Sequence, residues 1–343
     1  MTAPRRAGDA APPALSLLLA ILLAALLAAF SLAAPRAPAA PAVPPGVTGT
    51  PRYLPVMLKP PSPTPTSTPP PVTPPAGGDW RAYLGYYRAL SRLPGISENL
   101  GWSDGAFKHA RYMVENQTAS GSEIPDAPYY SSEGAAAGAN SLLQLQGSLS
   151  LTDRQALDQW MQWPFHALDV LDPALGSTGF GSYRRDAGSF DMAAALDVRR
   201  GLGSVPGGTA YPLKWPDHNT TVYLTRYDGA EQPDPLTSCP GFPLGFGSGL
   251  PVIVQIGPGD QTPVVTAHNF RRGATELEHC VFDETNYANS NPGLQAQGRA
   301  SLDARDAIVL IPKAELEAGN SYTVSITVNG QIISWTFNVA AGS

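Results

Sequence analysis

The sequence is poor in cysteine and in charged side chains. Two cysteines among 343 residues allow one bridge, which excludes both a disulfide-dense scaffold and a Cys-rich zinc module. Lys and Arg number 22 against 28 Asp and Glu, so the chain lacks the excess of positive charge that nucleic-acid binding needs. No His-Glu-x-x-His, Walker loop or dinucleotide fingerprint is present either. No nucleic-acid partner is expected, and none of these catalytic motifs is present to indicate a reaction.

Long apolar and proline-rich stretches fill the N-terminus instead. Ala14 to Ala34 carries no charge over 21 positions, which meets the ~20 residues that a membrane-spanning helix needs. Arg5 and Arg6 precede it, as in the positive flank that stays cytoplasmic. Residues 1–34 are therefore predicted to be a signal peptide or an uncleaved signal anchor, and the two alternatives stay open. In either case the rest of the chain is expected outside the cytoplasm, secreted or anchored to the membrane.

Residues 35–78 form a second distinct segment. Sixteen of these 44 residues are proline, which fixes φ and removes backbone donors. The segment is predicted to be a disordered linker that samples polyproline II and separates the folded part from the membrane.

The first folded domain is predicted over residues 79–203. Apolar residues at helical spacing from Trp80 to Leu90 predict a helix, and Thr152 with Gln155 forms a capping-box pattern at the start of another. We also expect a helix capped by Ser103 and one over Ala135–Leu145. Strands over Gly179–Tyr183 and Phe190–Val198 follow the helices. This order favours an α+β domain over a doubly wound parallel sheet.

Several short motifs in this domain resemble the bacterial branch of the CAP superfamily, also called SCP domains. They are Trp102-Ser103-Asp104 with His109 to Met113, Ser132-Glu133-Gly134, Trp160 to His166, and Leu171-Asp172-Pro173 followed by Gly179-Phe180-Gly181. The resemblance implies a three-layer α-β-α sandwich with an open cleft, usually in a secreted protein. In many members two His and two Glu line that cleft and can hold a divalent ion.

The resemblance singles out three candidate cleft residues, His109, Glu133 and His166. Glu133 matches a family glutamate, but Ser122 and Glu123 stand where a family histidine is expected, and the strand histidine is missing. We therefore expect no cofactor and no metal site of the family type, although a divalent metal is not excluded. Each candidate also has a structural alternative, as a packed histidine or a helix-start carboxylate. If Glu133 and a histidine met, they would perform general acid–base chemistry.

The second domain is predicted over residues 208–343. Strands are expected at Thr221–Leu224, Pro251–Ile256, Thr262–Ala267, Ala307–Ile311, Ser321–Val328 and Gln331–Val339. Asn329-Gly330 between the last two is a strong hairpin signal. The pattern predicts an antiparallel β-sandwich, and its last strands resemble bacterial Ig-like modules. Cys239 and Cys280 are expected to form a disulfide outside the cytoplasm, with two buried free thiols as the alternative.

Three functions fit these features. The depleted His/Glu set favours binding over catalysis, so the first expectation is a membrane-tethered CAP-like protein that binds a small molecule, a glycan or a protein in its cleft. A structural or adhesive envelope protein is the second. A hydrolase that uses Glu133 with His109 or His166 is the third.

Overall fold

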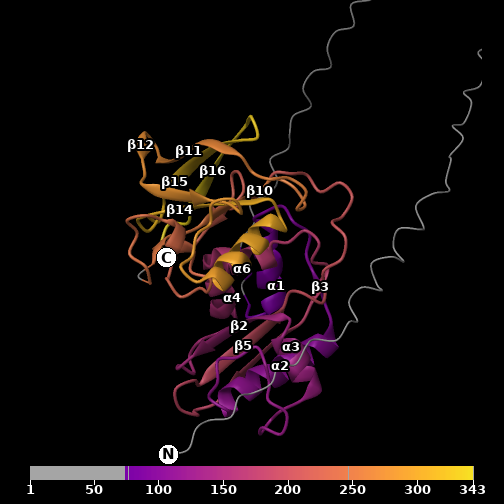
Figure 1. Cartoon of the computed structure of the whole chain (residues 1–343). Coiled ribbons are helices and arrows are strands. Elements are labelled where there is room, and N and C mark those ends of the chain that lie inside the picture. Colours follow the sequence, from indigo (N-terminus) through magenta and orange to yellow (C-terminus); the bar gives the residue numbers. More distant parts are fainter. Residues whose placement is uncertain (1–73, 76, 246, 343) are drawn as a thin grey trace, which may run out of the picture. The chain divides into compact units, whose positions relative to one another are not determined.

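The computed structural model describes residues 74–75, 77–245 and 247–342, all of which belong to one compact unit (Figure 1). The predicted signal or anchor segment and nearly all of the predicted linker lie outside the described residues. Among the residues that are described, no helix combines the length and the apolar character needed to cross a bilayer.

The first part of this unit consists of helices arranged around a small sheet. Its elements are α1 (Trp80–Ala89), β1 (Ser97–Glu98), α2 (Leu100–Glu115), α3 (Ser132–Gly138), β2 (Ser141–Gln146), α4 (Asp153–Gln162), α5 (Pro164–Val170), β3 (Ser177–Thr178), β4 (Phe180–Arg184) and β5 (Met192–Asp197). The sheet has the antiparallel order β2-β5-β4, and β1 pairs with β3 in parallel.

Strand β5 shows why helices cover both faces of this sheet. All six of its side chains are buried, and successive side chains in a strand point to opposite faces. Ala193 packs with Ala110 and Met113 of α2, whereas Met192 and Ala194 belong to the core that contains α1, α4 and α5. In Figure 1, α2 and α3 lie on one side of β2 and β5, and α1 and α4 lie on the other. The predicted three-layer α-β-α sandwich is confirmed.

Local predictions in this part have mixed outcomes. The helix from Trp80 and the capping box of Thr152 with Gln155 are confirmed. The cap of α2 is Asn99 and not Ser103, because the Asn99 side chain accepts the first free backbone N–H groups. The helix predicted over Ala135–Leu145 is wrong: α3 ends at Gly138, and β2 begins three residues later and pairs with β5 along its whole length.

The second part is rich in strands. Its elements are β6 (Leu213–Trp215), β7 (Thr221–Val222), β8 (Arg226–Tyr227), η1 (Pro235–Ser238), β9 (Ser248–Gly249), β10 (Val252–Gln255), β11 (Val265–Arg272), β12 (Thr275–Glu276), β13 (His279–Phe282), α6 (Pro292–Asp303), β14 (Ala307–Pro312), β15 (Ser321–Val328) and β16 (Gln331–Val339). One sheet has the order β13-β14-β10-β6 and another the order β12-β11-β15-β16-β7, while β8 pairs with β9. Both larger sheets contribute to one continuous apolar core.

The last hairpin matches its prediction residue for residue. β15 and β16 occupy the predicted ranges and pair from Val328 opposite Gln331 to Ser321 opposite Asn338. Asn329 and Gly330 have φ values of 50° and 74°, the left-handed conformation that a two-residue hairpin turn requires.

Two features are additional to the predicted antiparallel sandwich. β7 pairs with β16 in parallel, and helix α6 packs against β14. β10 and β14 are buried at every position, as strands covered on both faces are. Asn291 as cap and Pro292 at the first position were the available signal for α6. The Ig-like assignment and the boundaries at 203 and 208 stay predictions.

The disulfide is confirmed, because Cys239 after η1 is bonded to Cys280 in β13 across 41 positions. Closing a loop of this length restricts the unfolded chain, so replacing both cysteines by alanine should lower the free energy of unfolding by about 3–4 kcal/mol. Guanidinium unfolding would measure the difference. Dithiothreitol should bring the wild type to the level of the variant and leave the variant unchanged; an equal effect of the reductant on both proteins would contradict this account.

Candidate functional site

The junction between α4 and α5 places the candidate His166. Trp163 ends α4 and precedes Pro164, which is the first residue of α5. A residue before proline is pushed away from the helical conformation, and Trp163 is extended, with φ −96° and ψ 111°. The chain therefore breaks between the two helices, and His166 lies in the first turn of α5.

Two acidic side chains from the loop after β8 hold this junction. The Trp163 indole N–H donates to Asp228 Oδ1 at 2.6 Å, and the Gln159 amide donates to Asp228 Oδ2 at 2.6 Å. The His166 backbone N–H donates to Glu231 Oε1 at 2.8 Å, and His166 Nδ1 lies 2.6 Å from the same oxygen. Glu231 thus caps α5 and fixes the imidazole ring at once.

Glu231 is buried while His166 reaches the surface. The Glu231 side chain has no exposed area, and the His166 side chain is 18% exposed. Burial raises the pKa of Glu231, and the hydrogen bonds from His166 oppose that rise. The contact with Glu231 occupies Nδ1 and leaves Nε2, the other ring nitrogen of His166, outside this hydrogen bond.

His166 borders a hollow of about 470 Å³, which we call the His166 hollow. Its polar lining includes Ser141, Asp169, Arg199, Gln297, Ser301 and Arg305. The Arg305 guanidinium is compensated by Asp169 and Asp172 at 2.8 and 2.9 Å. Arg199 is exposed and donates to a backbone carbonyl, that of Ala139. The hollow therefore combines the imidazole of His166 with donors on Arg199 and Gln297.

The other two predicted site residues lie elsewhere. His109 is fully buried: its Nδ1 is 3.0 Å from Glu123 Oε1, and its Nε2 is 3.0 Å from the carbonyl oxygen of Ser120. Glu133 is exposed, and its carboxylate lies 3.7 Å from Lys108 Nζ. Its own backbone N–H and Lys108 lower the pKa of Glu133. No hydrogen bond or ion pair joins any two of His109, Glu133 and His166.

These residues do not fit a divalent-ion site. His109 and Glu123 use their polar atoms on each other and on the backbone, because Glu123 Oε2 also accepts the Ser131 N–H at 2.9 Å. Within the described ranges, no three His, Cys, Asp or Glu side chains gather as metal ligands would. A tight zinc site needs three or four such ligands.

A second polar cluster lies along α4. Asp158 accepts hydrogen bonds from the hydroxyls of Tyr87 and Tyr223, the latter at 2.6 Å, and Arg154 Nε lies 3.5 Å from its other oxygen. Burial raises the pKa of Asp158, and the two tyrosine hydroxyls oppose that rise. The cluster joins α1, α4 and the residue after β7, at the edge of a hollow of about 740 Å³.

Sequence reasoning missed most of these partners. Glu231 and Asp228 lie 65 and more positions from the groups they bind, so no local spacing reveals them. Glu123 was noticed only as a departure from the family pattern.

The layered α+β architecture around β2-β5-β4, with the Trp160–His166 segment at the α4–α5 junction, defines a CAP-type domain. The family model described as CAP, the cysteine-rich secretory protein family, matches residues 82–196, so this part of the chain belongs to the CAP family. No curated protein matches the chain.

A crystal structure of an extracellular protein containing a SCP domain from Bacillus anthracis str. Ames is similar at 16% sequence identity. The match covers 34% of this chain and 38% of that one, with a TM-score of 0.27. A likeness this weak carries no weight for function.

The contact between α3 and His109 generates a stability prediction. A Cβ added at Gly138 would lie 2.3 Å from His109 Cε1 and 2.6 Å from the carbonyl oxygen of Gly121. Gly138→Ala should therefore lower the free energy of unfolding by about 1–3 kcal/mol. Gly85→Ala in α1 is the matched control, because nothing lies within 4 Å of its added Cβ. Its higher helix propensity should raise stability by roughly 0.5–1 kcal/mol. Urea unfolding of both variants checks this, and equal effects would refute it.

Burial of Asp158 generates a pH-dependent prediction. Because its folded pKa lies above the ordinary value of 3.8, the folded state favours the protonated acid, and stability is lost as pH rises through the folded pKa. Asp158→Asn keeps an acceptor for both tyrosines and does not ionise. The free energy of unfolding of the variant minus that of the wild type should therefore increase between pH 4 and pH 7. Urea unfolding at a series of pH values measures it; a difference independent of pH would show that this carboxyl carries no such penalty.

Proposed function

We propose that this chain is an exported CAP-domain protein that binds a polar ligand of the glycan class in the His166 hollow. The N-terminal apolar segment would place it outside the cytoplasm, secreted or tethered to the membrane. The observation that carries the proposal is the His166–Glu231 pair, in which a fully buried carboxylate orients an imidazole toward a surface hollow.

The chemistry of the lining supports a ligand with many hydroxyl groups. A sugar hydroxyl both donates and accepts, so it can pair with the His166 imidazole in either protonation state, and Arg199 and Gln297 supply further donors in the hollow. The aliphatic and aromatic atoms of Leu142 and Phe165 line the same hollow and suit the C–H faces of a sugar ring. Ligand pockets commonly combine an apolar lining with a few oriented polar groups.

The two other functions find less support. A hydrolase of Glu133 with His109 or His166 requires these side chains to meet, and each of them is engaged with a different partner. A purely structural or adhesive role does not require a buried carboxylate to orient His166 beside a surface hollow.

The test fills the hollow without touching the pair that holds it. Ala300 on α6 lines the hollow and is exposed, and Ala296 on the same helix is exposed but does not line it. We expect the full-length wild type to bind members of an immobilised glycan panel, Ala300→Trp to lose at least tenfold in affinity by steric exclusion, and Ala296→Trp to bind like the wild type.

The opposite results are equally informative. Unchanged binding by Ala300→Trp would show that the glycan binds elsewhere on the chain and would contradict the proposed site. Absence of binding across the panel would favour the structural role, since the wild type would then recognise no ligand of the proposed class.

A further inference from the structure

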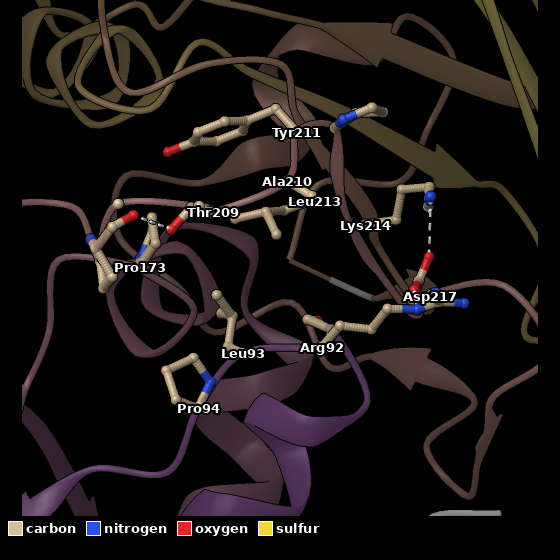
Figure 2. A pocket seen from close by; sticks show the side chains of 15 residues that line it. Arg92, Leu93, Pro94, Pro173, Thr209, Ala210, Tyr211, Leu213, Lys214 and Asp217 are labelled. Atoms are coloured by element: carbon tan, nitrogen blue, oxygen red, sulfur yellow. Dashed lines mark hydrogen bonds and ion pairs between the residues drawn. The ribbon is translucent and has the colours of Figure 1, made fainter. Parts of the chain in front are cut away.

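A separate hollow of about 480 Å³ lies between the end of α1 and the segment that joins β5 to β6; we call it the Ser91 hollow. It shares no lining residue with the His166 hollow. Figure 2 shows Arg92, Lys214 and Asp217 grouped at one end, and Pro94 and Pro173 at the other. The hollow is therefore charged at one end and apolar at the other.

The charged end has more cations than anions. Lys214 Nζ lies 3.0 Å from Asp217 Oδ1, and the Arg92 guanidinium pairs with the other oxygen of the same carboxylate. One buried carboxylate thus serves two cations. A further anion placed here would gain attraction from the cation that Asp217 leaves only partly neutralised.

A buried arginine, Arg88, is hydrogen-bonded to the backbone of the wall of the hollow. Arg88 is fully buried and donates to the backbone carbonyls of Pro94 at 2.8 Å and of Val170 at 2.7 Å, not to a carboxylate. Burial lowers the pKa of Arg88 to about 10, so the group keeps its charge at neutral pH. Pro94 itself lines the hollow, so Arg88 holds one residue of the wall in place.

Ser91 supplies an independent sign of a ligand. It is 2% exposed and lines the hollow, and its Oγ has no hydrogen-bond partner among the described residues. A buried hydroxyl without a partner costs free energy that a ligand oxygen would recover.

We propose that the Ser91 hollow binds a small organic carboxylate with a compact apolar body. The ligand carboxylate takes a share of Lys214 and Arg92 from Asp217 and accepts a hydrogen bond from Ser91 Oγ. The apolar body lies against Leu93, Pro94 and Pro173. This site is independent of the proposed glycan binding, because it uses other residues on another part of the unit.

Isothermal calorimetry of the full-length chain with benzoate and with its uncharged analogue benzamide tests the proposal. Benzoate should bind at least tenfold more tightly than benzamide, since only benzoate gains charge-assisted hydrogen bonds. Lys214→Met should weaken benzoate binding about tenfold or more and leave benzamide unaffected. Lys313→Met is the matched control, because Lys313 forms an ion pair with Glu278 at 2.7 Å outside this hollow.

A variant that is expected to bind benzoate more tightly distinguishes a change in the site from a loss of folding, because a misfolded protein would bind more weakly. Asp217→Asn removes the carboxylate that competes for Lys214 and Arg92, so benzoate should bind several-fold more tightly, while Ser91→Ala should weaken it about tenfold. Equal binding of benzoate and benzamide, equal effects of Lys214→Met and Lys313→Met, or no benzoate binding to the wild type would each overturn the proposal. Weaker benzoate binding by Asp217→Asn would do so as well.

Discussion

The α4–α5 junction depends on two carboxylates that come from outside the CAP-matching residues. Asp228 and Glu231 follow β8, yet they bind Trp163, Gln159 and His166 in the CAP domain. The Glu231 side chain is fully buried, and the hydrogen bonds of its Oε1 go to the backbone N–H and to Nδ1 of His166, so this carboxyl depends on the CAP domain for its partners. The strand-rich part therefore supplies groups that hold the α4–α5 junction of the CAP domain, and both parts belong to one compact unit.

The same contact links the stability of the helix start to the orientation of the candidate site residue His166. Glu231 caps α5 and orients His166 with one oxygen, so a substitution of Glu231 disturbs the helix start together with the hollow. Burial already raises the pKa of Glu231, and its Oε2 has no partner among the described residues. Burying the Glu231 carboxyl costs desolvation free energy, which the packing of the surrounding core must offset. Ala300→Trp fills the hollow from α6 and leaves the His166–Glu231 pair intact, so it tests ligand binding without disturbing the start of α5.

The sequence predicts those elements whose signal is local. β15 and β16 follow from strict alternation and from the Asn329-Gly330 turn, and α4 follows from its capping box. The run after Ser131 misleads because Ala- and Leu-rich residues suit a helix, whereas pairing with β5 makes Ser141–Gln146 a strand. The site follows the same rule. His166 belongs to a contiguous motif and can be found from the sequence. Glu231 is distant in sequence and is brought to His166 only by the tertiary fold. His109 is buried and pairs with Glu123, so it does not reach a surface hollow.

Both hollows extend beyond the CAP-matching residues, so the family pattern describes only part of their lining. The family model ends at residue 196, and both hollows take part of their lining from beyond it: Gln297 and Arg305 in one, Lys214 and Asp217 in the other. Folds host many functions, and the function resides in the residues added to them. His166 and Asp169 of one hollow and Arg92 and Pro94 of the other lie within the matched range, so each hollow combines residues of the CAP-matching part with residues beyond it. Relatives that share only the CAP-matching residues should consequently lack part of the lining of each hollow.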